Sequence, residues 1–308
     1  MQSTSLIRPA LSLALALAAA LTLVRPHTFH AQAGANERTL FVSALDADGN
    51  PVAGLQGNDF IVREDGVRRE VLRVSRANDP IDVALLVDNS TAARALIVPM
   101  REGLKRFIAV ISSPDAPPHQ VAIIGIGTRP TILAEYTADA ALLNAATGRI
   151  FAEPMSGMTL LDGIVEASKG IEKREAPRAV IAPVITDGTE FTNRYYRDVI
   201  EAMKRAGVSF MPVTVGTFPL GLDEPTRNRA FVIDQGPRDT GGRQVTLLSE
   251  MAVTGALEKL ARELVSQYKV VYARPESLIP PEKVEISTGR SGTTVHGTPA
   301  RGQKTSGA

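Results

Sequence analysis

The sequence predicts an α/β fold in which a doubly wound, mostly parallel sheet is accompanied by small flanking β segments. Apolar runs of strand length recur along the chain, and in the first of them, Ile81 to Val87, Asp82 is the one polar interruption. Such a run is typical of a strand that is buried on both faces of a parallel sheet. Segments with apolar residues at helical spacing separate the runs. This alternation of strands and helices implies crossovers that cover both faces of one sheet.

The predicted α/β domain spans residues 80–268. In chain order we expect strand 81–87, helix 100–111, strands 121–126 and 131–136, helix 160–171, strand 179–185, helix 196–206, strand 208–215 and helix 257–268. Pro183 inside one of these strands weakens that assignment, whereas Gly207 is a C-cap signal for the helix before it. Residues 217–243 are rich in Gly, Pro and charge, so we expect an irregular insertion or a long loop there.

The residues before this domain, 34–79, predict a small β module. Thr39 to Leu45 resembles a strand, and the cluster that begins at Asp46 is a turn. The alternative is a calcium loop, because Asp46 and Asp48 are spaced as in an EF-hand. That loop requires Gly at its sixth position and Glu at its twelfth, where Pro51 and Gly57 stand, so the hairpin turn is favoured.

The residues after the domain predict a short C-terminal β extension at 269–290. Its strand candidates are 270–272 and 284–287. We expect these strands to share one small sheet with the N-terminal module, because the two segments border the same domain. Residues 291–308 are rich in Gly, Ser and Thr and are expected to be a disordered tail.

The first 33 residues have the pattern of a secretory signal peptide. Arg8 precedes an apolar run from Pro9 to Val24, and Ala31-Gln32-Ala33 is a small-x-small cleavage site, so the mature chain is expected to start at Gly34. The alternative is an uncleaved membrane anchor, but a spanning helix needs about 20 apolar residues and this run is shorter. The sequence therefore predicts a secreted or periplasmic protein without a transmembrane anchor after cleavage.

Composition narrows the classes of function. The 308 residues include 34 basic and 33 acidic side chains, so no basic surface for nucleic acid is expected. The chain has no cysteine, which excludes a disulfide and a lipoprotein anchor. Ordinary shares of hydrophobic residues, 44%, and charged residues, 22%, provide enough apolar material for a sizeable core.

Oxygen-bearing side chains follow two predicted strands and precede one predicted helix. The strand at 81–87 leads into Asp88-Asn89-Ser90, Thr159 precedes the helix at 160–171, and the strand at 179–185 leads into Thr186-Asp187-Gly188. Ligands of open α/β sheets bind at the carboxyl ends of the strands. If the loops converge, Asp88, Ser90, Thr159 and Asp187 face one point. Carboxylate and hydroxyl oxygens suit a hard cation such as Mg²⁺ or Ca²⁺ and leave a coordination position for an acidic group of a partner.

These four residues resemble, in order and spacing, the metal-ion-dependent adhesion site of von Willebrand factor type A (vWA) domains. That motif is Asp-x-Ser-x-Ser after the first strand, a later Thr, and an Asp after the fourth strand. The flanks, Pro51 to Leu55, Asp59 to Gly66, and Leu264 to Tyr268 with Tyr272, are similar to a secreted vWA-related family abundant in acidobacteria. The resemblance covers most of residues 39–290. It implies a vWA fold, a divalent cation held by Asp88, Ser90, Thr159 and Asp187, and a protein or matrix partner.

One position departs from the motif. Ala92 stands where the motif has its second Ser, and a methyl group cannot ligate a metal. The neighbouring Thr91 should point elsewhere if the local backbone is preserved. A water could fill the vacant position with some loss of affinity, and some vWA domains bind partners without metal. The sequence therefore leaves open whether a cation binds.

Enzymatic alternatives have little support. After the signal peptide the chain holds two histidines, His119 and His296, so a His-based triad or a zinc site has few residues to draw on. Gly125-Ile126-Gly127 lacks the third glycine of a dinucleotide loop. An aspartyl-phosphate phosphatase needs a second Asp two residues after Asp88, where Ser90 stands.

For each site residue taken alone, a turn or helix-cap role is an ordinary alternative. Taken together, they predict an exported vWA-domain protein that binds a protein or matrix ligand through a degenerate metal site. The second hypothesis is an envelope scaffold with a vestigial, metal-free site, and a phosphatase-like hydrolase is the third.

Overall fold

A computed structural model of the chain describes residues 35–217, 223–275, 279 and 281–301. The described elements belong to one compact unit that begins at Asn36. The signal peptide predicted at 1–33 and the last residues of the predicted tail, 302–308, lie outside the described residues. Within the described ranges, no helix is both long and apolar enough to cross a membrane.

A seven-stranded sheet forms the centre of an α/β domain. Its order is β11-β10-β8-β5-β6-β7, with β9 also beside β8. The strands are β5 (Ile81–Val87), β6 (His119–Gly125), β7 (Thr131–Thr137), β8 (Arg178–Ile185), β9 (Val208–Phe210), β10 (Val213–Val215) and β11 (Val245–Leu247). The β6–β7 pair is antiparallel and the other pairs are parallel. The predicted doubly wound, mostly parallel sheet is therefore confirmed.

Pro183 lies inside β8 without breaking the sheet. On one side of β8, the residues Ala179 to Ile181 pair with β9, and pairing with β10 resumes at Val184. Pro183 falls in the gap between these two short partners, where its missing N–H interrupts no pairing on that side. The proline is compatible with a central strand because the strands beside it change at this point.

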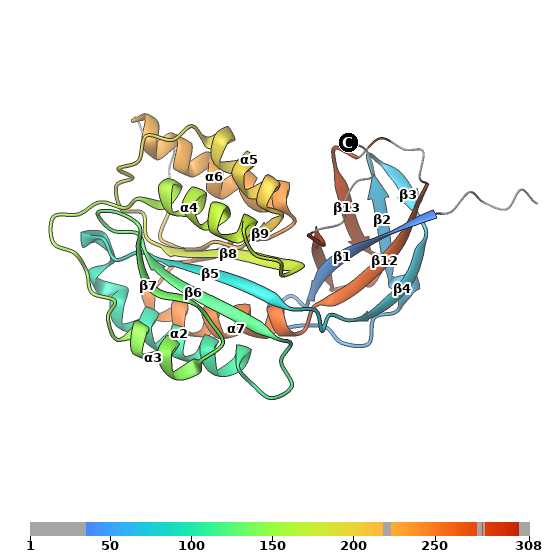
Figure 1. The fold of residues 1–308 in the computed structure, drawn as a ribbon, viewed down its shortest axis with the longest axis horizontal. Helices are drawn as coiled ribbons and strands as arrows, with labels where there is room; N and C mark the ends of the chain where they lie inside the picture. The colour runs from blue at the N-terminus through green and yellow to red at the C-terminus, as the bar shows by residue number, and fades with distance from the viewer. Residues whose placement is uncertain (1–34, 218–222, 276–278, 280, 302–308) are drawn as a thin grey trace, which may run out of the picture. The chain divides into compact units, whose positions relative to one another are not determined.

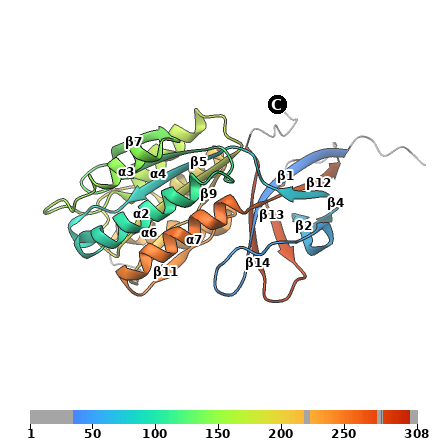
Figure 2. The same cartoon turned by 90° about the horizontal axis from the view of Figure 1, so that it is seen from below.

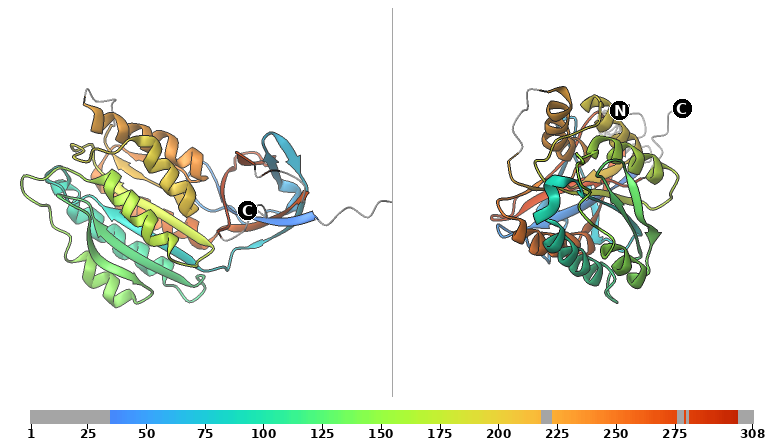
Figure 3. Two further views of the ribbon diagram at one scale, coloured as in Figure 1. Left: turned by 45° about the horizontal axis from the view of Figure 1, so that its top comes forward. Right: turned by 90° about the vertical axis from the view of Figure 1, so that its left-hand side faces the viewer.

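Helices cover both faces of the sheet (Figures 1 and 3). One layer consists of α2 (Ile97–Ile111), α3 (Ala140–Thr147) and α7 (Val253–Val265), and the other of α4 (Leu160–Glu172), α5 (Tyr196–Ala206) and α6 (Glu224–Thr240). Successive side chains of β5 enter opposite cores: Val83, Leu85 and Val87 pack toward α2 and α7, and Ala84 and Leu86 toward α4 and α5. This explains why the strand needs apolar residues at nearly every position.

The helices α2 and α7 lie side by side on their face of the sheet (Figure 2). They approach closely at Gly103, where an added Cβ would lie 2.9 Å from Leu257 and 3.0 Å from the backbone of Thr254. Three short 3-10 turns, η1 (Gly57–Asp59), η2 (Thr91–Ala95) and η3 (Glu250–Ala252), precede β2, α2 and α7. One residue, Leu96, separates η2 from α2, whereas α7 follows η3 directly.

The two ends of the chain build a small β sandwich together. Its strands are β1 (Ala35–Leu45), β2 (Phe60–Glu64), β3 (Val67–Arg69), β4 (Val71–Arg76), β12 (Tyr268–Pro275), β13 (Val284–Thr288) and β14 (Thr294–Pro299). They form the sheets β14-β1-β12-β4 and β13-β2-β3, so each sheet combines blue strands from the start of the chain with red strands from its end (Figure 1). The expected pairing between the flanking segments is confirmed, in two small sheets instead of one. The α/β domain is thus inserted between the neighbouring strands β4 and β12.

Two expectations from the sequence were wrong. The segment 217–243, expected to be irregular, contains α6, which begins after the N-cap Asp223 and ends at Gly241 in the left-handed conformation. The predicted disordered tail contains β14, which pairs antiparallel with β1. The helix α6 packs on α5 and β9, and β14 is held by a strand near the other end of the described chain. By contrast, the turn at Asp46 is confirmed, since its carboxylate accepts the backbone N–H groups of Asp48 and Asn50.

Candidate functional site

The loop after β5 holds two of the predicted residues in direct contact. Asp88 is fully buried, and its Oδ1 accepts the backbone N–H of Ser90 at 2.9 Å. Its Oδ2 accepts both the backbone N–H and the hydroxyl of Thr186, at 3.0 and 2.5 Å. The Asp88 carboxylate therefore ties the end of β5 to the end of β8.

Ser90 is the least explained residue of this loop. Its hydroxyl is buried and has no hydrogen-bond partner among the residues that the structure describes. Ser90 precedes η2 but makes no side-chain cap, so the capping alternative does not account for it. A buried hydroxyl without a partner is costly, and such a group calls for an explanation in the chemistry of its surroundings.

The loop after β8 brings Asp187 to the same edge of the sheet. Asp187 is exposed, and its side chain approaches Gly216 at the end of β10. The next residue, Gly188, faces the loop after β5: a Cβ there would lie 2.8 Å from the Ala92 methyl and 3.5 Å from the Ser90 hydroxyl. The two loops are therefore in close contact beside Asp187. Within the described ranges, no hydrogen bond joins Asp187 to the other three predicted residues.

Thr159 immediately precedes α4. Its hydroxyl donates toward the carbonyls of Gly127 at 3.1 Å and Ile126 at 3.3 Å, and it makes no cap bond to its own helix. The one hydroxyl proton of Thr159 is therefore used by the residues that follow β6. The lone pairs of the hydroxyl oxygen remain able to accept a hydrogen bond or to ligate a cation. The adjoining backbone pairs with the loop after β8, because Met158 donates to Thr189 and accepts from Phe191.

A polar brace that sequence analysis missed fixes the neighbouring loops. Asn89 donates to Glu153 at 3.0 Å and accepts the backbone N–H of Gly127 at 2.7 Å. Glu153 in turn accepts the N–H of Thr128 at 2.9 Å. Burial alone would raise the pKa of Glu153, but these hydrogen bonds outweigh it and hold the pKa below its usual range. An added Cβ at Gly127 would lie 2.8 Å from the Glu153 carboxylate and 3.0 Å from Asn89 Oδ1, so a larger residue there would have to displace this brace.

Ala92, which stands where the motif has its second Ser, also contributes to the packing of the loops. The Ala92 methyl packs toward Gly188 at the point where the two loops meet. Thr91 cannot substitute for a hydroxyl at that point, because its own hydroxyl donates to the Glu153 carbonyl at 2.9 Å. The expectation that Thr91 points elsewhere is therefore confirmed.

Sequence analysis also missed two buried residues with ionisable side chains. Glu190 lies in the loop after β8, and Arg229 contacts this loop from α6. Glu190 and Arg229 are each 2% exposed. Burial raises the pKa of Glu190 to about 7, against the opposing effects of its hydrogen bonds from Thr192 and the charge of Arg229. Arg229 extends from α6 and donates to the carbonyl of Gly188. No local sequence signal links α6 to this loop, whereas Asp223 and Pro225 are recognisable start signals for the helix itself.

The chemistry of the donors fits a hard cation with an incomplete ligand set. Asp88 and Asp187 offer carboxylates, Thr159 offers lone pairs, and Ser90 offers a hydroxyl without a partner. These are the oxygen types that Mg²⁺ and Ca²⁺ prefer. In the part of the chain that the structure describes, no group of three or more His, Cys, Asp or Glu residues gathers as a metal site. The candidate site has two carboxylates, and we call its four residues, Asp88, Ser90, Thr159 and Asp187, the cation pocket.

Exposed apolar side chains lie in the loops at this same edge of the sheet. Six of the twelve exposed large hydrophobic residues of the described chain lie in the loops at the carboxyl ends of the strands or just before α4. We call these six residues the apolar rim: Phe151, Met155, Phe191, Tyr195, Leu248 and Met251. Met155 is 96% exposed and has a positive φ of 53°, which is uncommon for a residue other than glycine.

The residues of the motif thus follow β5, precede α4 and follow β8 at one edge of a doubly wound sheet. In the order of these residues and in the form of its sheet, the α/β domain resembles a vWA domain. No protein-family model and no curated protein matches the chain. Solved structures do match, and the three described below have TM-scores under 0.5.

Three of these structures illustrate the likeness. Proximal thread matrix protein 1 from the mussel byssus is 16% identical with a TM-score of 0.48, over 66% of this chain and 49% of that one. The vWF domain of the type V pili tip protein Mfa5 from Porphyromonas gingivalis is 12% identical with a TM-score of 0.47, over 60% and 94%. A von Willebrand factor type A protein from Catenulispora acidiphila is 12% identical with a TM-score of 0.46, over 87% and 74%. The chain thus spans about half the length of the mussel protein.

Proposed function

We propose that this chain is a binding protein, and not an enzyme, that engages a protein or matrix ligand outside the cytoplasm through the loops at the carboxyl edge of its sheet. The observation that carries the proposal is the apolar rim, which lies at the same edge of the sheet as Asp88, Ser90, Thr159 and Asp187. Exposed apolar side chains that gather around one site are a mark of interaction surfaces. Covering them with a partner gains about 25 cal/mol per Å² of apolar surface removed from water.

The cation pocket at this edge supplies the polar part of this proposal. Asp88, Ser90, Thr159 and Asp187 would hold Mg²⁺ or another divalent cation, which when bound offers a coordination position to an acidic group of the partner. The hydroxyl of Ser90, buried without a partner beside the Asp88 carboxylate, supports this assignment. With Ala92 in place of a hydroxyl, we expect the cation to bind weakly.

The positions of the histidines also support a binding role. His119 begins β6 at the amino edge of the sheet, where its ring lies 3.3 Å from Ser112, and His296 lies on β14 beside Glu263. Neither is in the loops that form the pocket. A general base for hydrolysis would have to come from the carboxylates alone, which favours the binding function over the phosphatase-like alternative.

The test is a comparative capture experiment with envelope and culture-medium extracts. The mature chain and its Met155→Ser/Phe191→Ser variant serve as bait, with Leu142→Ser, an equally exposed apolar position on α3, as the matched control. We expect one ligand to be captured by the parent and by Leu142→Ser and lost with the rim variant. Equal capture of the ligand by the parent and by the rim variant would contradict the proposal.

Repeating the capture with a chelator separates the two binding hypotheses. If the ligand is lost when the cation is removed, the pocket takes part in binding. If capture depends on the rim but not on the cation, the alternative of a metal-free scaffold is correct. An activity screen with phosphate-ester substrates tests the hydrolase hypothesis, for which we expect no turnover.

Export is part of the same proposal. The apolar run from Pro9 to Val24 and the Ala31-Gln32-Ala33 site predict cleavage after Ala33. N-terminal sequencing of protein from the native envelope or medium is expected to begin near Gly34. An intact Met1 on that material would exclude cleavage.

A further inference from the structure

A buried arginine lies directly behind the candidate cation pocket. The Arg229 side chain is 2% exposed and donates from its guanidinium to the backbone carbonyl of Gly188. Gly188 follows the predicted ligand Asp187 in the chain, and a Cβ added at Gly188 would lie 3.5 Å from the hydroxyl of the predicted ligand Ser90. The positive charge of Arg229 is therefore bonded to a residue that adjoins both predicted ligands.

The helix that carries Arg229 is firmly placed. The Asp223 carboxylate caps the start of α6 by accepting the N–H of Thr226 at 2.9 Å. Asn228, the neighbour of Arg229, is buried and accepts the backbone N–H of Tyr196 at the start of α5. These contacts fix the helix, and the Arg229 side chain itself is held by its burial and by its bond to the Gly188 carbonyl.

The carboxylates of the pocket are the electrostatic partners of this arginine. Burial lowers the pKa of Arg229, and the charges of Glu190, Asp88, Asp187 and Asp223 oppose that effect. A guanidinium keeps its proton in proteins, so the charge is present at every physiological pH. A buried charge is tolerated when opposite charges accompany it, and here two of those charges are the predicted metal-ligating aspartates.

We propose that the Arg229 guanidinium is the resident counter-charge of this pocket and that it lowers the affinity of the pocket for a divalent cation. The inference rests on the proposed cation site. A cation that enters the pocket meets a fixed positive charge of the same sign and shares the same carboxylates with it. The guanidinium therefore offsets part of the repulsion between the two aspartates in the absence of metal, and the partly neutralised pocket attracts a cation less strongly.

The test is a calorimetric titration of the mature chain with Mn²⁺. Arg229→Gln removes the charge and keeps an amide donor for the Gly188 carbonyl, whereas Arg229→Lys keeps the charge. Arg238→Gln is the matched control, because Arg238 lies on the same helix, is exposed and pairs with Asp234. We expect Arg229→Gln to bind Mn²⁺ at least about tenfold more tightly than the parent, since like charges a few ångströms apart at a protein site repel by more than the thermal energy. Arg229→Lys and Arg238→Gln should remain close to the parent.

Each other outcome overturns the inference, and the Ala92→Ser variant separates the reasons. If Ala92→Ser binds Mn²⁺ more tightly than the parent but Arg229→Gln does not, the cation site is correct and the role of Arg229 is wrong. If neither variant binds, the cation site itself is wrong and the inference fails with it. Tighter binding by Arg238→Gln as well would mean that net charge, not the placement of Arg229, controls affinity.

A second pair of variants applies if Arg229→Gln does not fold. Arg229→Gln/Glu190→Gln removes both buried charges together and leaves neither one uncompensated. We expect this double variant to bind Mn²⁺ more tightly than Glu190→Gln alone. Equal affinities would overturn the inference.

Discussion

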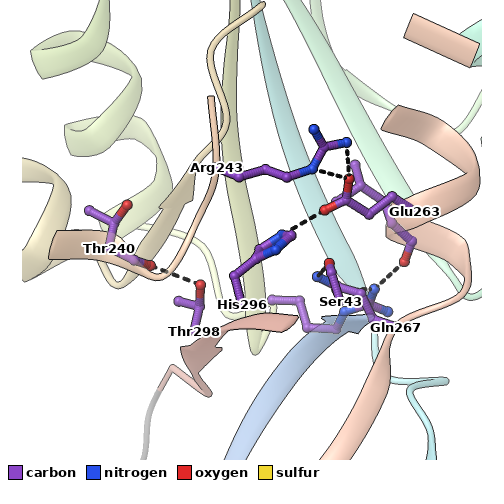
Figure 4. Close-up of polar contacts among 9 residues, drawn as sticks. Ser43, Thr240, Arg243, Glu263, Gln267, His296 and Thr298 are labelled. Carbon is purple, nitrogen blue, oxygen red and sulfur yellow. Dashed lines mark hydrogen bonds and ion pairs between the residues drawn. The ribbon is translucent and has the colours of Figure 1, made fainter. Parts of the chain in front are cut away.

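Glu263 offers the sharpest stability prediction, because it is a fully buried carboxylate that joins α7 to the β sandwich (Figure 4). Its Oε1 accepts from Nε2 of His296 on β14 at 2.7 Å. Its Oε2 accepts from the Nε and the Nη2 of Arg243, at 2.8 and 2.6 Å. Gln267, four residues later, adds a bond to Ser43 on β1 at 3.1 Å. We predict that Glu263→Ala strongly destabilises the chain.

The size of the effect follows from the burial of the partners. The Glu263 side chain is 0% exposed, and His296 and Arg243 are 13% and 25% exposed. Removing one member of a buried charged group typically costs about 3–5 kcal/mol. Because water can reach part of Arg243 in the variant, we expect the lower end of that range, about 3 kcal/mol.

The matched control is Glu258→Ala on the same helix. Glu258 also pairs with two arginines, Arg106 and Arg262, but both of these are more than half exposed. Exposed pairs contribute little, so we expect a loss of less than about 1 kcal/mol. Urea unfolding followed by circular dichroism measures both variants. A Glu263→Ala loss no greater than that of Glu258→Ala would refute the reasoning.

The pH dependence gives a second check on the same residue. Burial alone would raise the pKa of Glu263, but the hydrogen bond and charge of His296 and the charge of Arg243 outweigh it and hold the pKa below its ordinary value of 4.5. A lowered pKa means that this contribution to stability is present above pH 4.5 and is lost as the pH falls through the pKa of the folded state. The difference between parent and Glu263→Ala should therefore shrink on acidification below pH 4.5.

Two further predictions concern Glu190 and Gly241. Burial raises the pKa of Glu190 to about 7, so its contribution is present below its ordinary value of 4.5 and is lost as the pH rises through 7. Between pH 5 and 8, urea unfolding should show the parent losing up to about 3 kcal/mol relative to Glu190→Gln, and parallel pH curves would contradict this. Gly241 has a φ of +72°, and an added Cβ would lie 1.9 Å from the Gly297 carbonyl oxygen. Gly241→Ala should therefore cost at least about 2 kcal/mol of unfolding free energy, against about 1 kcal/mol for Gly49→Ala, whose φ is +78° and whose Cβ would meet nothing within 4 Å. Equal losses would show that the clash at Gly241 is relieved at no cost.

Much of the α/β domain was predictable because its buried strands require continuous apolar runs. Ile81–Val87 and the region of β8 are visible in the sequence for that reason. The helix α6 was not, because the face that it buries is largely polar. Asn228, Arg229 and Thr240 are buried beside Val232 and Ile233, so the helical period of apolar residues is weak.

The remaining misses have a different physical origin, which is contact between segments distant in sequence. The strand β14 is a short, half-polar segment whose partner β1 lies near the other end of the chain. In the candidate site, the order of the motif indicated Asp88, Ser90, Thr159 and Asp187. The sequence could not indicate that Thr186 donates a hydrogen bond to the Asp88 carboxylate, or that Asn89 and Glu153 bond to each other across the loops. Nor could it indicate that Arg229 extends from α6 to the loop after β8.

The central claim, a cation pocket at the carboxyl edge of the sheet, is tested most directly by melting temperature in a Mg²⁺ and Mn²⁺ series. Three proteins are compared: the parent, Ala92→Ser and Asp187→Ala. A bound cation stabilises the folded state by RT ln(1 + [M]/Kd), about 1.4 kcal/mol at a concentration tenfold above Kd. We expect a small shift for the parent at millimolar metal, a larger one for Ala92→Ser, and none for Asp187→Ala. If Ala92→Ser responds no more than the parent, or if Asp187→Ala responds equally, the proposed ligand geometry is wrong and binding depends on the apolar rim alone.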